Sequence, residues 1–316
     1  MKVIITGAAG QDGRLLGSLL SEHGYTLLGI DRAFDGTWPG RTVCCDVADH
    51  ATMDRLIAEF QPDEIYHLAA CHHSAEGSTD LELETQMLST NFLSTRIVIA
   101  SMLNHVPRCR LLIACSSQMY AARYAGDTVD EGTHPSPTTF YGLTKKWSWD
   151  LVKYARSTYG TYACAAILFN HESPLRGRQF VTRKIAAAAA RASISEETNL
   201  TLQDIEAESD WSSARDIVAG MKTILGASDP GDFVLASGAL HSVSDVLEVA
   251  FERVGLDWRA FVEAPSNARS RRPSLVGDAS KAKRELDWQP SVSFRTMIEE
   301  MVDQDLALLG ANSPAR

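Results

Sequence analysis

Short apolar runs alternate with longer amphipathic stretches along the first half of the chain. The amphipathic stretches carry apolar residues at helical spacing, which predicts helices near 12–23, 50–60, 84–104 and 140–159. The apolar runs predict buried strands at 2–6, 26–30, 41–44, 64–68, 110–115 and 162–168. Strands and helices in this order form a parallel sheet with helices on both faces. We therefore expect an α/β fold built on a doubly wound parallel sheet.

The pattern changes after Leu168. A loop rich in Pro, Arg and Gly is followed by an alanine-rich stretch, 183–192, whose composition favours a helix. The remaining expected elements are strands at 200–203 and 232–236 and helices at 243–255 and 294–309. We expect a first domain over residues 1–168, with segments near 212–240 returning to it, and a smaller α/β domain formed mainly by residues 169–316.

Three glycines, Gly7, Gly10 and Gly13, separate the first strand from the first helix. Glycine permits a tight turn and a close approach of backbone to ligand, and the following helix presents N–H groups and a positive dipole end to a pyrophosphate. An ordinary tight turn that binds no ligand would also be rich in glycine. The second strand favours a dinucleotide, because it ends in Asp31, which is placed to accept hydrogen bonds from an adenosine ribose. The first domain is therefore expected to be of the Rossmann type and to bind a dinucleotide.

The residues after the second strand bear on which dinucleotide binds. Asp31 favours NAD, whereas the adjacent Arg32 can pair with a 2′-phosphate, so NADP stays open. The glycine spacing GxxGxxG resembles that of the short-chain dehydrogenase/reductase superfamily. The residues that we assign to the cofactor site follow the ends of the first four strands: Gly7, Gly10, Gln11, Asp12, Gly13, Asp31, Arg32, Asp46, Val47, Leu68, Ala69 and Ala70.

Composition narrows the class of protein. The net charge is −10, with 40 acidic against 30 basic residues, which argues against a nucleic-acid-binding or membrane-surface protein. The six cysteines show no CxxC pair, so neither a zinc site nor a disulfide framework is indicated. The first strand begins directly after the first residue, and no apolar run is long enough to span a membrane. We expect a cytoplasmic protein.

A tyrosine and a lysine, Tyr141 and Lys145, lie four residues apart in a predicted helix and so project from one face. A nearby ammonium stabilises phenolate, which is expected to lower the pKa of Tyr141 and make it a base for a sugar hydroxyl; Lys145 can also hold the cofactor ribose. A tyrosine and a lysine that are simply exposed on an amphipathic helix, with no catalytic role, would have the same spacing. The hydroxyls of Ser116 and Ser117 at the end of a strand favour a catalytic role for Tyr141 and Lys145, since the superfamily keeps a substrate-binding hydroxyl there.

The chain resembles, over nearly its whole length, the GDP-mannose 4,6-dehydratases, an extended branch of this superfamily. The resemblance rests first on Asn170-His-Glu-Ser-Pro174 with Arg176-Gly177 and on 180–185, and it continues through 210–216, 231–243, 272–282 and 288–290. It implies that Asn170, Arg183, Lys184, Arg215 and Arg272 line a pocket for a nucleotide diphosphate and that Tyr141, Lys145 and Ser116 are catalytic. We also assign to the substrate site His72, Ser117, Glu172, Arg176 and Val181.

Two positions depart from the family pattern. The dehydratases carry a glutamate where this chain has Gln118, and that carboxylate removes the C5 proton of the sugar. An amide cannot take a proton at useful pH. Where the family shows Gln-Ser-His, this chain has Cys71-His72-His73. His72 or His73 can replace the missing base, because histidine titrates near neutrality, or the pair can pack and hydrogen-bond only. Glu76, Asp127 and Glu131 are further carboxylates, and no metal site is indicated.

The sequence supports several reactions. The resemblance implies an NAD(P)-dependent enzyme that oxidises a GDP-hexose at C4 and then removes water across C5 and C6. Gln118 leaves open a nucleotide-sugar 4-epimerase, 4-dehydrogenase or 4-ketoreductase. A non-catalytic NAD or sugar-nucleotide binder is a further alternative, as is a redox enzyme for a small non-nucleotide substrate. The resemblance also implies a homodimer or homotetramer, paired through the helix that carries Tyr141.

Overall fold

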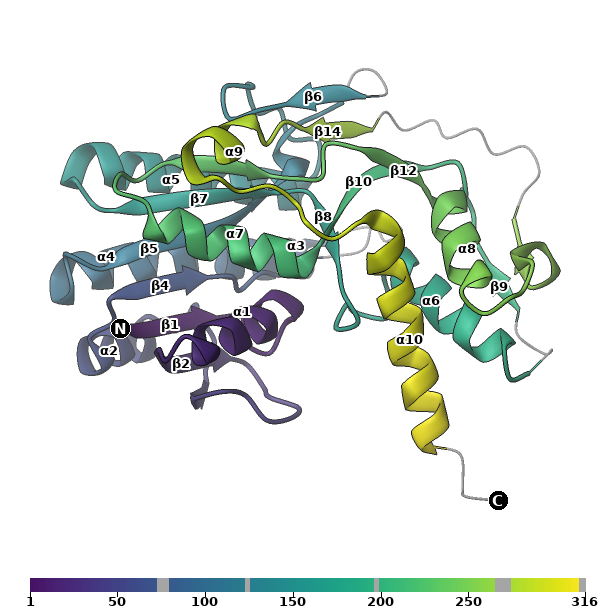
Figure 1. Cartoon of the computed structure of the whole chain (residues 1–316). Coiled ribbons are helices and arrows are strands. Elements are labelled where there is room, and N and C mark those ends of the chain that lie inside the picture. Colours follow the sequence, from purple (N-terminus) through teal and green to yellow (C-terminus); the bar gives the residue numbers. More distant parts are fainter. Residues whose placement is uncertain (73–79, 123–125, 196–198, 265–273, 313–316) are drawn as a thin grey trace.

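Seven of the strands pair as one parallel sheet, in the order β11-β7-β5-β4-β1-β2-β3 (Figure 1). The computed structural model describes residues 1–72, 80–122, 126–195, 199–264 and 274–312. Its strands are β1 (Lys2–Thr6), β2 (Thr26–Asp31), β3 (Arg41–Cys44), β4 (Glu64–His67), β5 (Arg110–Ser116), β6 (Asp127–Val129), β7 (Ala163–Leu168), β8 (Asn170–Glu172), β9 (Leu200–Thr201), β10 (Glu208–Ser213), β11 (Asp232–Leu235), β12 (Leu240–Ser242), β13 (Val262–Glu263) and β14 (Leu275–Gly277).

Helices cover both faces of this sheet. The α-helices of the described residues are α1 (Gln11–Glu22), α2 (His50–Phe60), α3 (Leu81–Met87), α4 (Ser94–His105), α5 (Phe140–Tyr159), α6 (Val181–Ala192), α7 (Ala214–Gly226), α8 (Val243–Glu252), α9 (Ser280–Leu286) and α10 (Phe294–Asn312). One core packs α2, α4 and α5 against the sheet, and a second packs α1, α7 and α9 against its other face. Burial on both sides explains why these strands are continuous apolar runs. The expected doubly wound fold is confirmed.

The strand order reverses between β1 and β4, which lie side by side with β2 and β5 beyond them. In open parallel sheets a ligand crevice forms at such a reversal, outside the carboxyl ends of the strands. The glycine turn, Asp31 and the Ser116–Ser117 pair lie at the carboxyl ends of strands, whereas Tyr141 and Lys145 lie on α5. The fold therefore gathers the first three features along one edge of the sheet.

The single helix expected over 84–104 is three segments instead. α3 and α4 are joined by the π-helical segment η1 (Leu88–Leu93). In η1 the buried side chain of Asn91 contacts Cys71: Asn91 Oδ1 accepts from Cys71 N at 2.8 Å, and Asn91 Nδ2 donates to Cys71 O at 3.1 Å. π-helical turns commonly mark functional positions. Here the turn aims an amide at the chain segment that follows β4.

A smaller sheet, β12-β10-β8, and the helices α6, α8 and α10 form the part of the molecule to the right in Figure 1. Its core includes the fully buried alanines of α6, whose small side chains let α10 and α8 pack closely. Segments from the second half also return to the first sheet: β11 pairs with β7, and α7 and α9 pack on it. The division into two domains at residue 168 stays a proposal.

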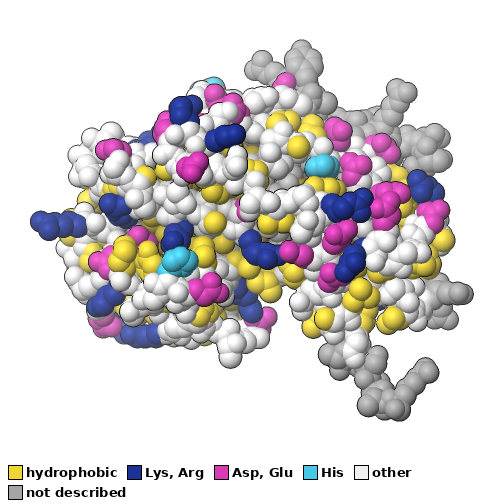
Figure 2. Space-filling model, viewed as in Figure 1, with side chains coloured by type: hydrophobic (Ala, Val, Ile, Leu, Met, Phe, Trp, Pro, Cys, Tyr) yellow, Lys and Arg dark blue, Asp and Glu magenta, His cyan; other side chains and the backbone are white. Residues whose placement is uncertain are grey.

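Charges are dispersed over the face of the molecule that Figure 2 draws. On the face drawn in Figure 2, Lys and Arg side chains lie among Asp and Glu side chains rather than in one extended basic patch. Within the described ranges, no helix combines the length and apolarity needed to cross a membrane.

One ion pair is buried between α6 and α10. The guanidinium of Arg183 forms a forked pair with the carboxylate of Asp305, and both side chains are less than a tenth exposed. Two residues earlier on α10, Asp303 makes a similar forked pair with Arg253, at 2.8 and 3.0 Å, but in solvent. The same interaction thus occurs on one helix in two environments.

We predict that Asp305→Ala lowers the free energy of unfolding by about 3–5 kcal/mol, because it leaves a buried guanidinium without its counter-charge. The matched control Asp303→Ala should cost only about 0–1 kcal/mol, since its pair is exposed. Urea denaturation of the three proteins measures both values. Equal losses of unfolding free energy in the two variants would show that burial does not make the Arg183–Asp305 pair more important for stability.

Candidate functional site

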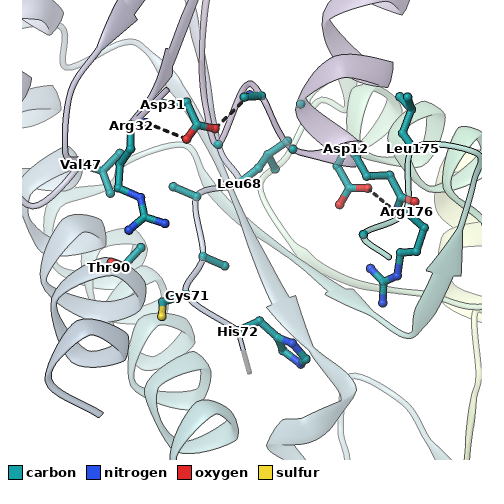
Figure 3. Close-up of a pocket in the computed structure, with 18 of the residues that line it drawn as sticks. Asp12, Asp31, Arg32, Val47, Leu68, Cys71, His72, Thr90, Leu175 and Arg176 are labelled. Carbon is teal, nitrogen blue, oxygen red and sulfur yellow. Dashed lines mark hydrogen bonds between the residues drawn. The ribbon is translucent and has the colours of Figure 1, made fainter. Parts of the chain in front are cut away.

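A cavity of about 450 Å³ opens outside the carboxyl ends of β1 to β4, where the strand order reverses (Figure 3). All twelve residues assigned to the cofactor site from the strand ends line this cavity. It is also lined by residues that the sequence did not assign to a site: Ala9, Cys45, Cys71, Thr90, Leu175, Gly177, Gln179 and Phe180. The structure therefore brings the predicted cofactor residues together, and adds a wall from the second half of the chain.

The glycine turn has no room for side chains. Gly7 adopts a φ of +70°, and a Cβ built on it would lie 2.7 Å from Ala69 N. A Cβ on Gly13 would lie 2.3 Å from the carbonyl oxygen of Gly7. The first turn of α1 thus packs directly on the turn that precedes it, and that turn packs on the segment after β4. The backbone N–H groups at the start of α1 are consequently presented to the cavity.

The carboxylate of Asp31 lies at the far side of the turn. It accepts hydrogen bonds from the backbone N–H of Ala9 at 2.9 Å and of Arg32 at 2.7 Å. A carboxylate has about four acceptor positions, so both oxygens can still accept from a ribose. Arg32 is exposed and lines the same cavity.

The start of α1 is joined to the second half of the chain through side chains. His171 Nε2 lies 2.9 Å from Asp12 Oδ2, and Ser173 Oγ donates to Gln11 Oε1 at 2.8 Å. Burial alone raises the pKa of Asp12, but the charge and hydrogen bond of His171 outweigh it and hold the pKa below its ordinary value. Burial alone lowers the pKa of His171, but the charge and hydrogen bond of Asp12 outweigh burial and raise this pKa above its ordinary value. The two groups form a charged pair that links the glycine turn to β8.

Tyr141 and Ser116 lie together at the end of β5. Burial raises the pKa of Tyr141, and the hydrogen bond with Ser116 and the charge of Arg176 reverse this only in part. The Lys145 ammonium is 5.7 Å from the centre of the tyrosine ring and donates to Ala114 O at 2.8 Å. The expectation that Lys145 lowers the pKa of Tyr141 is therefore wrong in this structure, because the ammonium is directed at the backbone. Burial also lowers the pKa of Lys145.

Gln118 and His72 meet beside Tyr141. Gln118 Nε2 lies 3.2 Å from His72 Nε2, and Gln118 Oε1 accepts from Thr139 Oγ1 at 3.3 Å. The His72 ring stands edge-to-face on the Tyr141 ring, with centroids 4.6 Å apart, and lies 5.7 Å from the ring of Phe180. His72 and Gln118 are both exposed, and His72 lines the cavity. The histidine and the amide that depart from the family pattern are thus in contact.

Arg176 enters the cavity from the other wall. Its guanidinium carbon lies 3.5 Å from the centre of the Phe180 ring, and its Nε is 3.2 Å from Oε2 of the buried Glu172. Thr182 donates to the same carboxylate at 2.7 Å. Figure 3 shows Arg176 and His72 reaching into the cavity from different segments. Glu172 therefore acts by holding Arg176.

The other assigned substrate residues are dispersed. Asn170 is exposed at the start of β8, Ser117 and Val181 begin a short helix and α6, and Lys184 is half-buried on α6. Arg215 forms a surface ion pair with Glu300. Arg183 is at odds with its predicted role, because its guanidinium is buried against Asp305 and does not line the cavity. His73 and Arg272 lie outside the described residues.

Three positioning residues were missed from the sequence: Asn91, Thr139 and Gly142. Thr139 caps α5 by accepting from Gly142 N at 3.0 Å and also binds Gln118. A Cβ on Gly142 would lie 2.1 Å from Gln118 O. The Thr139 cap has a sequence signal, a threonine directly before a helix that begins with an apolar residue. Asn91 has none, because its contact spans twenty residues. Among the described residues, no group of three or more His, Cys, Asp or Glu is arranged to hold a metal ion.

Comparison with known proteins gives a consistent family. The model of the family described as GDP-mannose 4,6 dehydratase matches residues 4–301. GDP-mannose 4,6 dehydratase 1 of Arabidopsis thaliana is 35% identical over 331 residues, covering 96% of this chain and 90% of that protein.

Two solved structures share the fold. A dTDP-glucose 4,6-dehydratase from Bacillus anthracis, in complex with NAD, has a TM-score of 0.81 at 17% identity and covers 96% of each chain. RMD from Pseudomonas aeruginosa, complexed with NADPH, has a TM-score of 0.81 at 17% identity, covering 97% of this chain and 99% of that one. At such identity the likeness is one of fold.

We predict that Gly142→Ala forces α5 away from Gln118, since a backbone oxygen 2.1 Å from the new Cβ cannot move independently. The expected loss is about 1–3 kcal/mol of unfolding free energy, as for an overpacked core. Gly226→Ala is the control, because its Cβ would meet nothing within 4 Å. Denaturant titration measures both; a neutral Gly142→Ala would contradict the close approach.

The His171–Asp12 pair predicts a defined pH dependence. Asp12, with a lowered pKa, stabilises the fold above its ordinary value of 3.8 and loses this as pH falls through the lowered value. His171, with a raised pKa, stabilises the fold fully below 6.5 and loses this as pH rises through the raised value. The stability difference between the natural protein and Asp12→Asn should therefore peak between pH 3.8 and 6.5 and shrink at higher pH. Asp35→Asn, whose ion pair is with Arg14, should show no change in the histidine range.

Proposed function

The chain belongs to the GDP-mannose 4,6-dehydratase family, and from this premise we propose that it binds NAD(P) and a GDP-linked hexose, oxidises the sugar at C4 and then removes water across C5 and C6. One observation carries the proposal: the Tyr141–Ser116 pair lies against His72, which lines the same cavity as the glycine turn. The residue proposed to accept the sugar hydroxyl proton thus lies next to a cavity that fits a dinucleotide.

The residues present fit a dinucleotide. The backbone of the glycine turn is bare where a Cβ would fill the space, and the N-terminus of α1 suits a pyrophosphate. Asp31 keeps acceptor capacity for a ribose, which supports NAD as the preferred cofactor. Arg32 beside it is the group that would bind the additional phosphate of NADP. The relatives of this fold include one protein in complex with NAD and one with NADPH.

The chain's own groups would prepare C4 for oxidation. Tyr141 is the base for the C4 hydroxyl proton, and Ser116 orients that hydroxyl through its bond to Tyr141. The nicotinamide ring would supply a hydride acceptor at this point and a hydride donor later. Lys145, whose ammonium is 5.7 Å from the centre of the Tyr141 ring, would hold the nicotinamide ribose. The C4 ketone that results makes the neighbouring C5 proton acidic.

Arginine and amide groups would bind the nucleotide diphosphate. Arg176 is the strongest candidate, because it enters the cavity and is held by Glu172 and Phe180. A guanidinium fork pairs with phosphate oxygens bidentately. Asn170, Lys184 and Arg215 lie on neighbouring elements and stay in the proposal as contributors. The GDP moiety is inferred from the family, since the curated relatives are named for GDP-mannose.

A second reaction is favoured by Gln118. Its amide is engaged with Thr139 and His72 and cannot accept a proton. If no other group does so, return of the hydride to C4 would make the enzyme a 4-epimerase, release of the 4-keto sugar would make it a 4-dehydrogenase, and the reverse of that oxidation would make it a 4-ketoreductase. The product mass distinguishes these reactions from elimination.

The proposal extends to the cellular compartment and the oligomeric state of the enzyme. All six cysteines are free thiols, as expected in a reducing compartment such as the cytoplasm. Leu81, Leu93 and Tyr154 are exposed on the contacting elements α3, η1 and α5. Exposed apolar side chains on elements that contact one another suit a subunit interface, which supports a homodimer or homotetramer.

We predict that the protein, supplied with NAD(P), converts GDP-mannose to a product lighter by one water. Tyr141→Phe should lower this rate by about 10²–10⁴-fold, because it removes the hydroxyl that transfers the proton. Tyr159→Phe, at the exposed far end of the same helix, is the control and should act like the natural protein. Mass spectrometry follows the product. A product of unchanged mass with inverted C4 would establish epimerisation instead, and full activity of Tyr141→Phe would remove Tyr141 from the chemistry.

A further inference from the structure

We propose that His72 carries the proton in the elimination stage, and that Gln118 is a positioning residue for its imidazole ring. This inference rests on the proposed C4 oxidation, because only a 4-keto sugar has an acidic C5 proton. It assigns to the chain's own residues the step that the family's glutamate would otherwise perform.

The position of His72 carries the argument. Its Nε2 lies 3.2 Å from the Gln118 amide, which stands where the family has its carboxylate. A ring nitrogen within hydrogen-bond distance of that position can reach the same region of a bound sugar. The ring also lies against Tyr141, the proposed C4 base, so C4 and C5 of one sugar can face the two groups together.

The ring is held on several sides. Tyr141 contacts it edge-to-face, and Phe180 lies 5.7 Å away at a tilt of 31°. The backbone before it is fixed by the double hydrogen bond between Asn91 and Cys71. A proton-transfer group must be placed within hydrogen-bond reach of the atom it serves, and a mobile ring would spend little time there.

The hydrogen bonds of Gln118 suit a positioning role. Its oxygen accepts from Thr139, which leaves its NH₂ to donate to His72 Nε2. A nitrogen that accepts carries no proton, so this bond favours the neutral imidazole with a lone pair at Nε2. When a 4-keto sugar binds, its C5–H bond would take the place of the amide as the neighbour of that lone pair.

Other ionisable groups near the cavity suit the step less well. Cys71 has a pKa raised by burial. Glu172 is buried and paired with Arg176, and Asp12 is paired with His171. Glu131, a carboxylate considered from the sequence, accepts from Val234 N at 2.7 Å. The ordinary pKa of an imidazole lies near neutrality, and because His171 is held by Asp12, His72 is the better suited of these two imidazoles.

The proposed step balances without a further reactant. The C5–H bond breaks, and the proton passes to Nε2 of His72. The electron pair forms the C5–C6 double bond as the C6–O bond breaks. The proton on His72 then passes to the departing oxygen, so that water leaves and His72 is neutral again. No oxidant or reductant is consumed in this stage.

The test separates the two stages with three variants. His72→Asn keeps a hydrogen-bonding side chain but cannot carry a proton, and His72→Asn combined with Gln118→Glu returns a carboxylate to the family position. His23→Asn, exposed at the end of α1, is the matched control. Each protein is given NAD(P) and GDP-mannose in deuterated water, and reduced nicotinamide, deuterium at C5 and loss of water are measured.

We expect His72→Asn to form reduced nicotinamide but to lose C5 exchange and water loss by about 10²–10⁴-fold. The double variant should recover at least a tenth of the lost rate, and His23→Asn should match the natural protein. Wild-type C5 exchange in His72→Asn, or equal loss of nicotinamide reduction and C5 exchange, would overturn the inference. If the natural protein forms no reduced nicotinamide, or forms it without C5 exchange, the proposed function fails; if the natural protein exchanges C5 and His72→Asn does so equally, only the inference fails.

A measurement without substrate examines Gln118 separately. Nitrogen NMR of the labelled histidine rings reports the tautomer of His72. We expect one dominant tautomer, protonated at Nδ1, in the natural protein and a mixture in Gln118→Leu. An unchanged tautomer in Gln118→Leu would remove the positioning role of Gln118.

Discussion

The close approach of three backbone segments at the strand-order reversal determines the rest of the site. Gly7 lies against Ala69, and Gly13 lies against the carbonyl of Gly7. These contacts leave no space for a single methyl group at either glycine. Because the segment after β4 is pressed against the turn after β1, its continuation to His72 starts from a fixed point. The amide of Asn91 then fixes the same segment from the opposite side. The cofactor turn and the cluster around Tyr141 are therefore parts of one packed arrangement.

Polar side chains connect this arrangement to the second half of the chain. Gln11 and Asp12, in the first turn of α1, bind Ser173 and His171. Arg176, a few residues further, is held by Glu172 and enters the same cavity. A ligand that contacts both the helix start and Arg176 would consequently touch two segments that already hold each other in place. Such preorganisation reduces the ordering cost of binding.

Much of the first sheet was predictable, because a strand buried on both faces must be a continuous apolar run and its ligand-binding residues follow its carboxyl end. The cofactor residues from Gly7 to Ala70 were found in this way, although their roles stay predictions. The ionic partners were not predictable. Arginine commonly binds phosphate, yet the guanidinium of Arg183 is paired with Asp305, which lies more than a hundred residues away in the sequence. The contact between His72 and Gln118 likewise joins two loops whose separation in sequence gives no signal. The pKa of Tyr141 was misjudged because burial depends on the assembled fold.

The Arg183–Asp305 pair bears on the order in which the chain can fold during synthesis. Domains generally form from the N-terminus as the chain emerges. The helix that carries Arg183 is made long before the helix that carries Asp305. Until α10 is available, closing the core of the smaller sheet and α6 would bury an uncompensated charge, which is strongly unfavourable. The smaller part of the molecule should therefore stay open on the ribosome until its last helix has been translated, while the sheet strands β1 to β5 and β7 can already pair.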